Sequence, residues 1–124
     1  MLTLTITISA TPSLNKMRGR WALTNLKRKY RKEFEGYEVF ALKEKKRMKV
    51  TVQRFGSRIL DLDNYVAGFK VVGDFLTEKG IIVDDSPKWL DLEFLPQVKC
   101  KRGEEKTVLI ITEAIDGQGA QGTH

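Results

Sequence analysis

The chain has 124 residues, of which 31% are charged and 41% hydrophobic, and it carries a net charge of +6. This length provides for one domain with one core, and no apolar run approaches the ~20 residues that a membrane helix needs. The single cysteine, Cys100, has no partner for a disulfide within this sequence and excludes a cysteine-based zinc site. The start, Met1–Ile6, lacks the features of a secretory signal, so we expect a cytoplasmic protein. Its basic charge favours a polyanionic partner such as DNA or RNA.

The first third of the chain predicts a strand and then a helix. Residues 2–9 alternate apolar and polar side chains, which is typical of a strand with one buried face. Between Arg18 and Glu35 apolar residues recur every four positions, with basic residues on the other side, which predicts an amphipathic helix. Gly36 is its expected end.

The middle of the chain predicts two strands and a second helix. Residues 37–42 fit a short strand, and residues 48–52 alternate more regularly and fit another. Apolar residues at helical spacing then predict a helix over residues 65–79, closed by Gly80.

The last third predicts more strands. Ile81–Val83 fits the end of a buried strand, and residues 89–101 and 107–113 fit a closing hairpin whose final strand is apolar on both faces. The order β-α-β-β-α-β-β indicates an α/β fold, a mixed β-sheet with two helices packed on it, in a single domain over residues 1–115. The Gly- and Gln-rich residues 116–124 predict a disordered tail.

Two acidic clusters flank the second predicted helix, which is unexpected in a basic protein. Asp61 and Asp63 precede the helix, and Asp84 and Asp85 follow it. If the first cluster is extended, both of its carboxylates leave the same face of the chain. Each cluster also has an ordinary structural interpretation, since Asp63 or Asn64 suits a helix N-cap and Asp-Asp-Ser-Pro suits a turn.

The helix between the clusters is about 15 residues, or roughly 20 Å, long. A strand that returns antiparallel to it would bring Asp84 and Asp85 back to the level of Asp61. Carboxylates gathered there would repel one another unless a divalent cation or raised pKa values relieved them. Hard oxygen ligands of this kind are what a Mg²⁺-dependent enzyme acting on nucleic acid needs.

These motifs resemble the signature of the RusA-type Holliday junction resolvases, small phage and bacterial endonucleases. The likeness covers most of residues 2–113 and is strongest between Asp61 and Ser86. It is carried by Asp61-Leu62-Asp63-Asn64, by Lys70 and Asp74, by Gly80-Ile81-Ile82-Val83-Asp84-Asp85-Ser86, by Thr11-Pro12-Ser13-x-Asn15 near the start and by Lys106-Thr107 near the end.

The resemblance implies a RusA-like fold and a homodimer that cuts four-way DNA junctions symmetrically with Mg²⁺ or Mn²⁺. It implies that Asp61, Asp63 and Asp85 are metal ligands and that Lys70 lies near the scissile phosphate. From the requirements of a bound Mg²⁺ alone, we expect Asp84 to be an outer or alternate ligand. The best-known members have their lysine three residues after the Asp-x-Asp-Asn element, whereas Lys70 lies six residues after Asn64. We therefore expect the extra residues, 65–68, before or at the start of the helix. An ion pair with Asp74 is the structural alternative for Lys70.

Basic residues that could contact DNA phosphates lie on the first helix and beyond it. The candidates are Arg18, Arg20, Lys27, Arg31, Lys46 and Arg58. A solvated helix face is the ordinary alternative for such a run. Trp21 and Trp89 are expected in the core, although an exposed tryptophan could stack on an unpaired base.

Three functions are consistent with the sequence. The leading hypothesis is a metal-dependent endonuclease for branched DNA. The second is a branched-DNA-binding protein that does not cleave, to which the displaced Lys70 points. The third is a structural domain stabilised by Ca²⁺.

Overall fold

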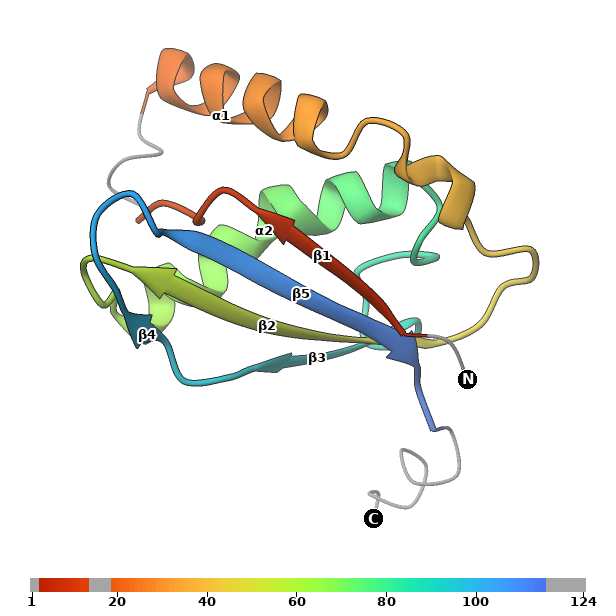
Figure 1. Cartoon of the computed structure of the whole chain (residues 1–124). Helices are drawn as coiled ribbons and strands as arrows, with labels where there is room; N and C mark the ends of the chain where they lie inside the picture. Colours follow the sequence, from red (N-terminus) through yellow and green to blue (C-terminus); the bar gives the residue numbers. More distant parts are fainter. Residues whose placement is uncertain (1–2, 14–18, 116–124) are drawn as a thin grey trace.

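The computed structural model describes residues 3–13 and 19–115, which form one β-sheet with helices packed on it (Figure 1). The elements in chain order are β1 (Leu4–Ile8), α1 (Arg20–Glu33), the 3-10 helix η2 (Tyr37–Phe40), β2 (Met48–Gly56), α2 (Leu62–Glu78), β3 (Leu90–Phe94), β4 (Val98–Lys99) and β5 (Lys106–Glu113). Neither α-helix is long and apolar enough to cross a membrane.

The sheet is mixed, as the sequence predicts. Its strand order is β1-β5-β2-β3, and β4 pairs with the far end of β2. Strand β5 runs antiparallel to both β1 and β2, whereas β3 runs parallel to β2. Because β1 and β2 therefore point the same way, their carboxyl ends and the loops that follow lie at one end of the molecule (Figure 1).

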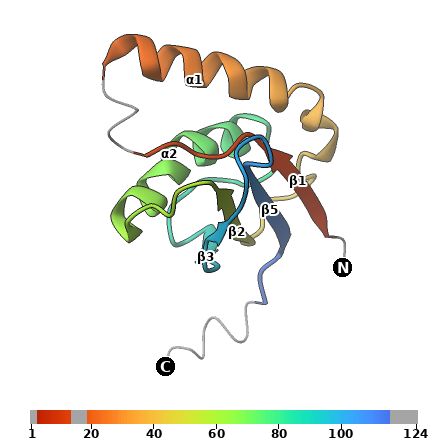
Figure 2. The ribbon, with the colours of Figure 1, turned by 60° about the vertical axis from the view of Figure 1, so that its left-hand side comes forward.

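The core lies on one face of the sheet. Ile6, Leu109 and Val52 stand side by side on β1, β5 and β2 and are buried. Both α-helices cover this face (Figure 2), and the ring of Phe34 from α1 stacks on that of Phe75 from α2 with centroids 5.5 Å apart. Burial of one stripe on each helix and one face of the sheet explains the two-layer form.

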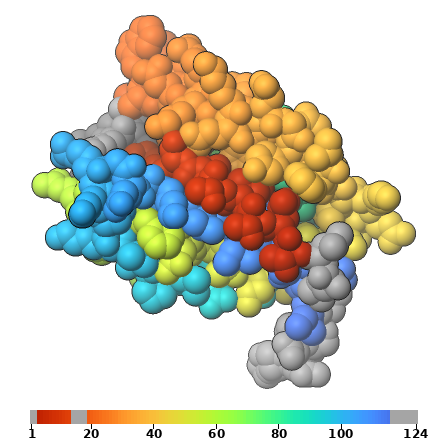
Figure 3. Space-filling model, viewed as in Figure 1, coloured from red at the N-terminus to blue at the C-terminus, as the bar shows by residue number. Residues whose placement is uncertain are grey.

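The other face of the sheet is open in the described part of the chain, and β1, β5 and β2 stand at the surface in Figure 3. Leu109 and Ile111 of β5 point into the core, while Val108 and Ile110 are only partly buried. The strand is apolar on both faces, as the sequence predicts, but only one of the two faces is fully buried.

Two predicted strands are not formed. Residues 37–40 form the 3-10 helix η2 instead, because local bonds such as that from the Ala41 N–H to the Glu38 carbonyl use the backbone. The chain at Ile81 and Ile82 is buried but is not a strand. Both of their N–H groups donate to the carbonyl of Leu76, at the end of α2.

The predicted closing hairpin is also wrong. Strands β3 and β4 pair with β2 on one side, and β5 lies on its other side, between β2 and β1. The turn at residues 102–105 is correct, but it carries the chain past the end of β2. Because β5 lies between β1 and β2, Leu109 and Ile111 have a neighbouring strand on each side. At the edge of the sheet they would have a neighbouring strand on one side only.

Candidate functional site

The first acidic cluster lies where β1 and β2 end and both α-helices begin (Figures 1 and 2). Asp61 is the N-cap of α2, and Leu62 is already helical, so Asp61 and Asp63 do not share a strand face as expected. The expected N-caps, Asp63 and Asn64, both lie inside the helix, and the carboxylate of Asp61 accepts no bond from the helix backbone. It instead accepts a 3.5 Å contact from Asn64 Nδ2. Both aspartates are exposed, and the positive end of the α2 dipole favours their charge.

The extra residues of the lysine spacing lie inside this helix. Residues 65–68 form part of the first turns of α2, between Asp61 and Lys70. The buried Tyr65 donates its hydroxyl hydrogen toward the carbonyls of Val52 and Leu95, which ties this part of α2 to the sheet. Residues 65–68 therefore lie in the helix, near its start, and do not precede it.

A polar hollow of about 360 Å³ opens beside Asp61. One of its lining side chains is Arg54, which is only 6% exposed. Arg54 donates from Nε to the Thr11 carbonyl at 2.7 Å and from Nη1 to the Arg58 carbonyl at 2.9 Å. The guanidinium thus joins the loop after β1 to the loop after β2, and both loops line the hollow.

Two neighbours shape this arginine. Burial lowers the pKa of Arg54, and the charge of Glu105 opposes that effect. A Cβ at position 56 would collide with Arg54 Nη1, so the guanidinium occupies space that only glycine leaves open. Glu105 is itself held by the backbone N–H of Ser57 at 2.8 Å and by its hydroxyl at 2.7 Å, and these bonds lower the pKa of the Glu105 carboxyl.

The second acidic cluster approaches the middle of α2. Lys70 Nζ lies 3.5 Å from Asp85 Oδ2, with the Lys70 side chain 72% exposed. Lys70 therefore contacts Asp85 and not Asp74, the expected alternative. It lies seven residues, about 10 Å of helix, beyond Asp63. The chain after α2 returns as an irregular segment, and it brings Asp85 to the level of Lys70.

The donor chemistry fits Mg²⁺, but the donors are not assembled. The exposed carboxylates of Asp61, Asp63, Asp84 and Asp85 are the hard oxygen ligands that Mg²⁺ prefers. Within residues 3–13 and 19–115, however, no three acidic, histidine or cysteine side chains lie close enough together to hold a metal ion.

The basic candidates are spread over the molecule. Arg20 is exposed at the start of α1, while Lys27 and Arg31 border a groove against α2. Arg58 is exposed at the polar hollow. Arg18 lies outside the described residues, as does Asn15 of the motif near the start.

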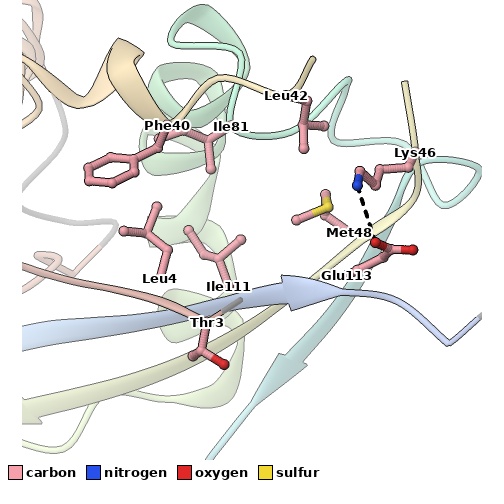
Figure 4. Close-up of a pocket in the computed structure, with 9 residues that line it drawn as sticks. All are labelled: Thr3, Leu4, Phe40, Leu42, Lys46, Met48, Ile81, Ile111 and Glu113. Atoms are coloured by element: carbon pink, nitrogen blue, oxygen red, sulfur yellow. Dashed lines mark hydrogen bonds and ion pairs between the residues drawn. The ribbon is translucent and has the colours of Figure 1, made fainter. Parts of the chain in front are cut away.

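Lys46 lies at the other end of the sheet, on an apolar pocket of about 490 Å³ (Figure 4). Its Nζ is 3.2 Å from Glu113 Oε1, so its charge is already paired. The rest of the lining is mostly apolar, including Leu4, Met48 and Ile111. Such a surface suits apolar groups better than phosphates.

The sequence analysis missed Arg54 and placed Trp21 in the core, and the periodicity carried a signal for both residues. Arg54 continues the alternation of buried residues along β2, after Met48, Val50 and Val52. The alternation therefore predicts that the side chain of Arg54 is buried. Trp21 was expected in the core but is 78% exposed, because it lies opposite the buried Tyr30 around α1. Trp89 is partly buried, with Lys88 Nζ over its ring.

No known family model matches this chain, and no curated protein matches it either.

Proposed function

We propose that this protein is a Mg²⁺- or Mn²⁺-dependent endonuclease that cuts branched DNA, with the four-way junction as its substrate. The observation that carries the proposal is the contact between Lys70 and Asp85, which joins the second acidic cluster to the helix that begins at the first. The net charge of +6 suits a DNA partner.

Hydrolysis of a phosphodiester needs an activated water and neutralised charge on the phosphate oxygens, and a bound Mg²⁺ supplies both. Asp61, Asp63, Asp84 and Asp85 are the residues that we propose hold it. The exposed ammonium of Lys70 would neutralise charge on the phosphate. Arg58 would hold a neighbouring phosphate at the mouth of the polar hollow.

The exposed aspartates must come together when a cation binds, so metal binding is the first requirement to test. Titration of the DNA-free protein with Mn²⁺ should show binding that Asp63→Asn and Asp85→Asn each weaken. Asp74→Asn, the same substitution at another exposed position of α2, should bind as the wild type does.

The decisive experiment incubates a four-way junction with the protein and Mg²⁺. We expect the wild type to make paired symmetric nicks. Asp63→Asn and Asp85→Asn should bind the junction without nicking it, and Asp74→Asn should nick it as the wild type does. Absence of nicks with both Mg²⁺ and Mn²⁺ would exclude the proposed activity.

The alternative is a branched-DNA-binding protein that does not cleave. The observation that favours it is that no three carboxylates gather among the described residues. It predicts tight binding to the junction without nicks in the same assay. A homodimer is part of the leading proposal only, because one site per chain cannot nick two strands in one binding event.

A further inference from the structure

The outward surface of α1 combines an exposed aromatic ring with a row of cations. Trp21 is 78% exposed, an unusual position for the largest apolar side chain. The helix carries six basic residues and one acidic residue, Glu33. That single carboxylate is occupied, because the backbone N–H and the hydroxyl of Ser9 both donate to it.

Helical spacing places the ring and two of the cations in one line. Arg28 and Lys32 follow Trp21 by seven and eleven residues, so all three lie on the same side of α1. Tyr30 and Phe34 are fully buried on the opposite side. The line from Trp21 to Lys32 is about 16 Å long, which equals roughly five phosphate spacings along one strand of duplex DNA.

The cations of this line are not neutralised within the described part of the chain. None of the ion pairs formed there includes a side chain of α1. Arg31 packs over the Phe75 ring at 5.5 Å and faces the α1–α2 groove, where Asp74 and Glu78 lie. Arg28 and Lys32 do not border that groove.

We infer that Trp21, Arg28 and Lys32 form a stacking site for an unpaired base of a nucleic-acid strand. The ring would stack on the base, and the two cations would follow the phosphates. The inference rests on the proposed function, because a DNA branch point can present unpaired bases. Both helices begin at the same end of the molecule, so Trp21 and Asp61 lie toward the same end (Figures 1 and 2).

The chemistry of this surface distinguishes a nucleic acid from a lipid membrane. A helix that lies in a membrane inserts a broad apolar face, and α1 has already buried that face in the core of its own domain. One tryptophan among cations remains, and this combination matches the stacking and charge requirements of a single strand.

The test compares DNA ligands without metal, so that it is independent of cleavage. Trp21→Ala should weaken binding to a junction with unpaired bases at the branch roughly ten- to a hundredfold. It should leave binding to a fully paired duplex unchanged, and Trp21→Phe should retain most of the affinity. Val39→Ala, at another exposed apolar residue, is the control and should change neither.

Equal loss on paired and unpaired ligands would overturn the stacking site, as would no loss on either. The wild type could also bind anionic phosphatidylserine vesicles. If Trp21→Ala abolished that binding and left DNA binding unchanged, the surface would be assigned to membranes instead. A Trp21 effect in a protein that makes no nicks would support this inference and contradict only the proposed cleavage.

Discussion

Arg54 shows how one residue can organise a site without belonging to its chemistry. A charged side chain on the buried face of a central strand needs hydrogen-bond partners, and two loop carbonyls accept bonds from Nε and Nη1 of Arg54. Those two loops line the polar hollow beside Asp61. The alternation along β2 placed position 54 in the core, but only the fold reveals which loops it holds.

Gly56→Ala should destabilise the protein through this arginine. The new Cβ would collide with Nη1, and moving the guanidinium would break its bonds to Thr11 and Arg58. We expect a loss of about 1–3 kcal/mol in the free energy of unfolding, measured by urea denaturation.

A double-mutant cycle provides the control for that prediction. In an Arg54→Ala background the space next to Gly56 is empty, so Gly56→Ala should cost much less there. The same cost in both backgrounds would show that the effect comes from the backbone and not from the contact.

Among the elements, the single strands and helices were more predictable than their arrangement. The spacing of apolar residues in β1, β2, α1 and α2 is a local property of the sequence, and all four elements form. The strands with which β5 pairs depend on distant residues, and there the predicted hairpin between residues 89–101 and 107–113 was wrong. Residues 37–40 were also misjudged, because apolar residues in a stretch this short fit a 3-10 turn as well as a strand.

The acidic clusters show the same difference between local and distant effects. Their positions on either side of α2 follow from the sequence, but their separation depends on how the chain returns after Gly80. An antiparallel strand would have carried Asp85 to the start of α2, whereas the observed irregular segment carries it to Lys70. The Lys70–Asp85 contact could not be predicted, since it depends on this route.

Glu105 connects two elements and should make their association sensitive to acid. It ties the turn before β5 to Ser57 after β2, and these bonds hold its pKa below the ordinary value. A carboxyl whose pKa is lower in the folded state adds stability above its unfolded pKa, and that stability is lost as the pH falls through the folded pKa. This loss of stability should therefore occur at pH values below the ordinary pKa of glutamate.

Glu105→Gln should reduce the fall in the urea midpoint between pH 7 and acid pH, because the amide cannot titrate. Glu104→Gln changes the adjacent residue by the same charge and should leave the wild-type pH dependence in place. If both variants have the wild-type profile, the Ser57–Glu105 contact does not contribute to acid sensitivity.

At the scale of the whole molecule, α1 is the described element with the most basic residues. The helix α1 alone carries six basic residues in a chain whose net charge is +6. The two lysines on and near β2, Lys46 and Lys49, are instead paired with glutamates at 3.2 and 3.1 Å. The outward surface of α1 is therefore the surface that we expect a polyanion to meet first.

This asymmetry predicts how salt weakens DNA binding. If about six cations contact phosphates, the logarithm of the binding constant should fall with the logarithm of salt concentration with a slope of about −5. Removing Arg28 and Lys32 together should make that slope shallower by roughly 2, because each phosphate contact contributes about 0.9.

The matched double variant Lys46→Ala, Lys49→Ala removes two cations that are already paired, so it should keep the wild-type slope. Fluorescence anisotropy with labelled DNA at several salt concentrations measures all three slopes. Equal changes in the two double variants would mean that the net charge, and not the α1 surface, determines DNA binding.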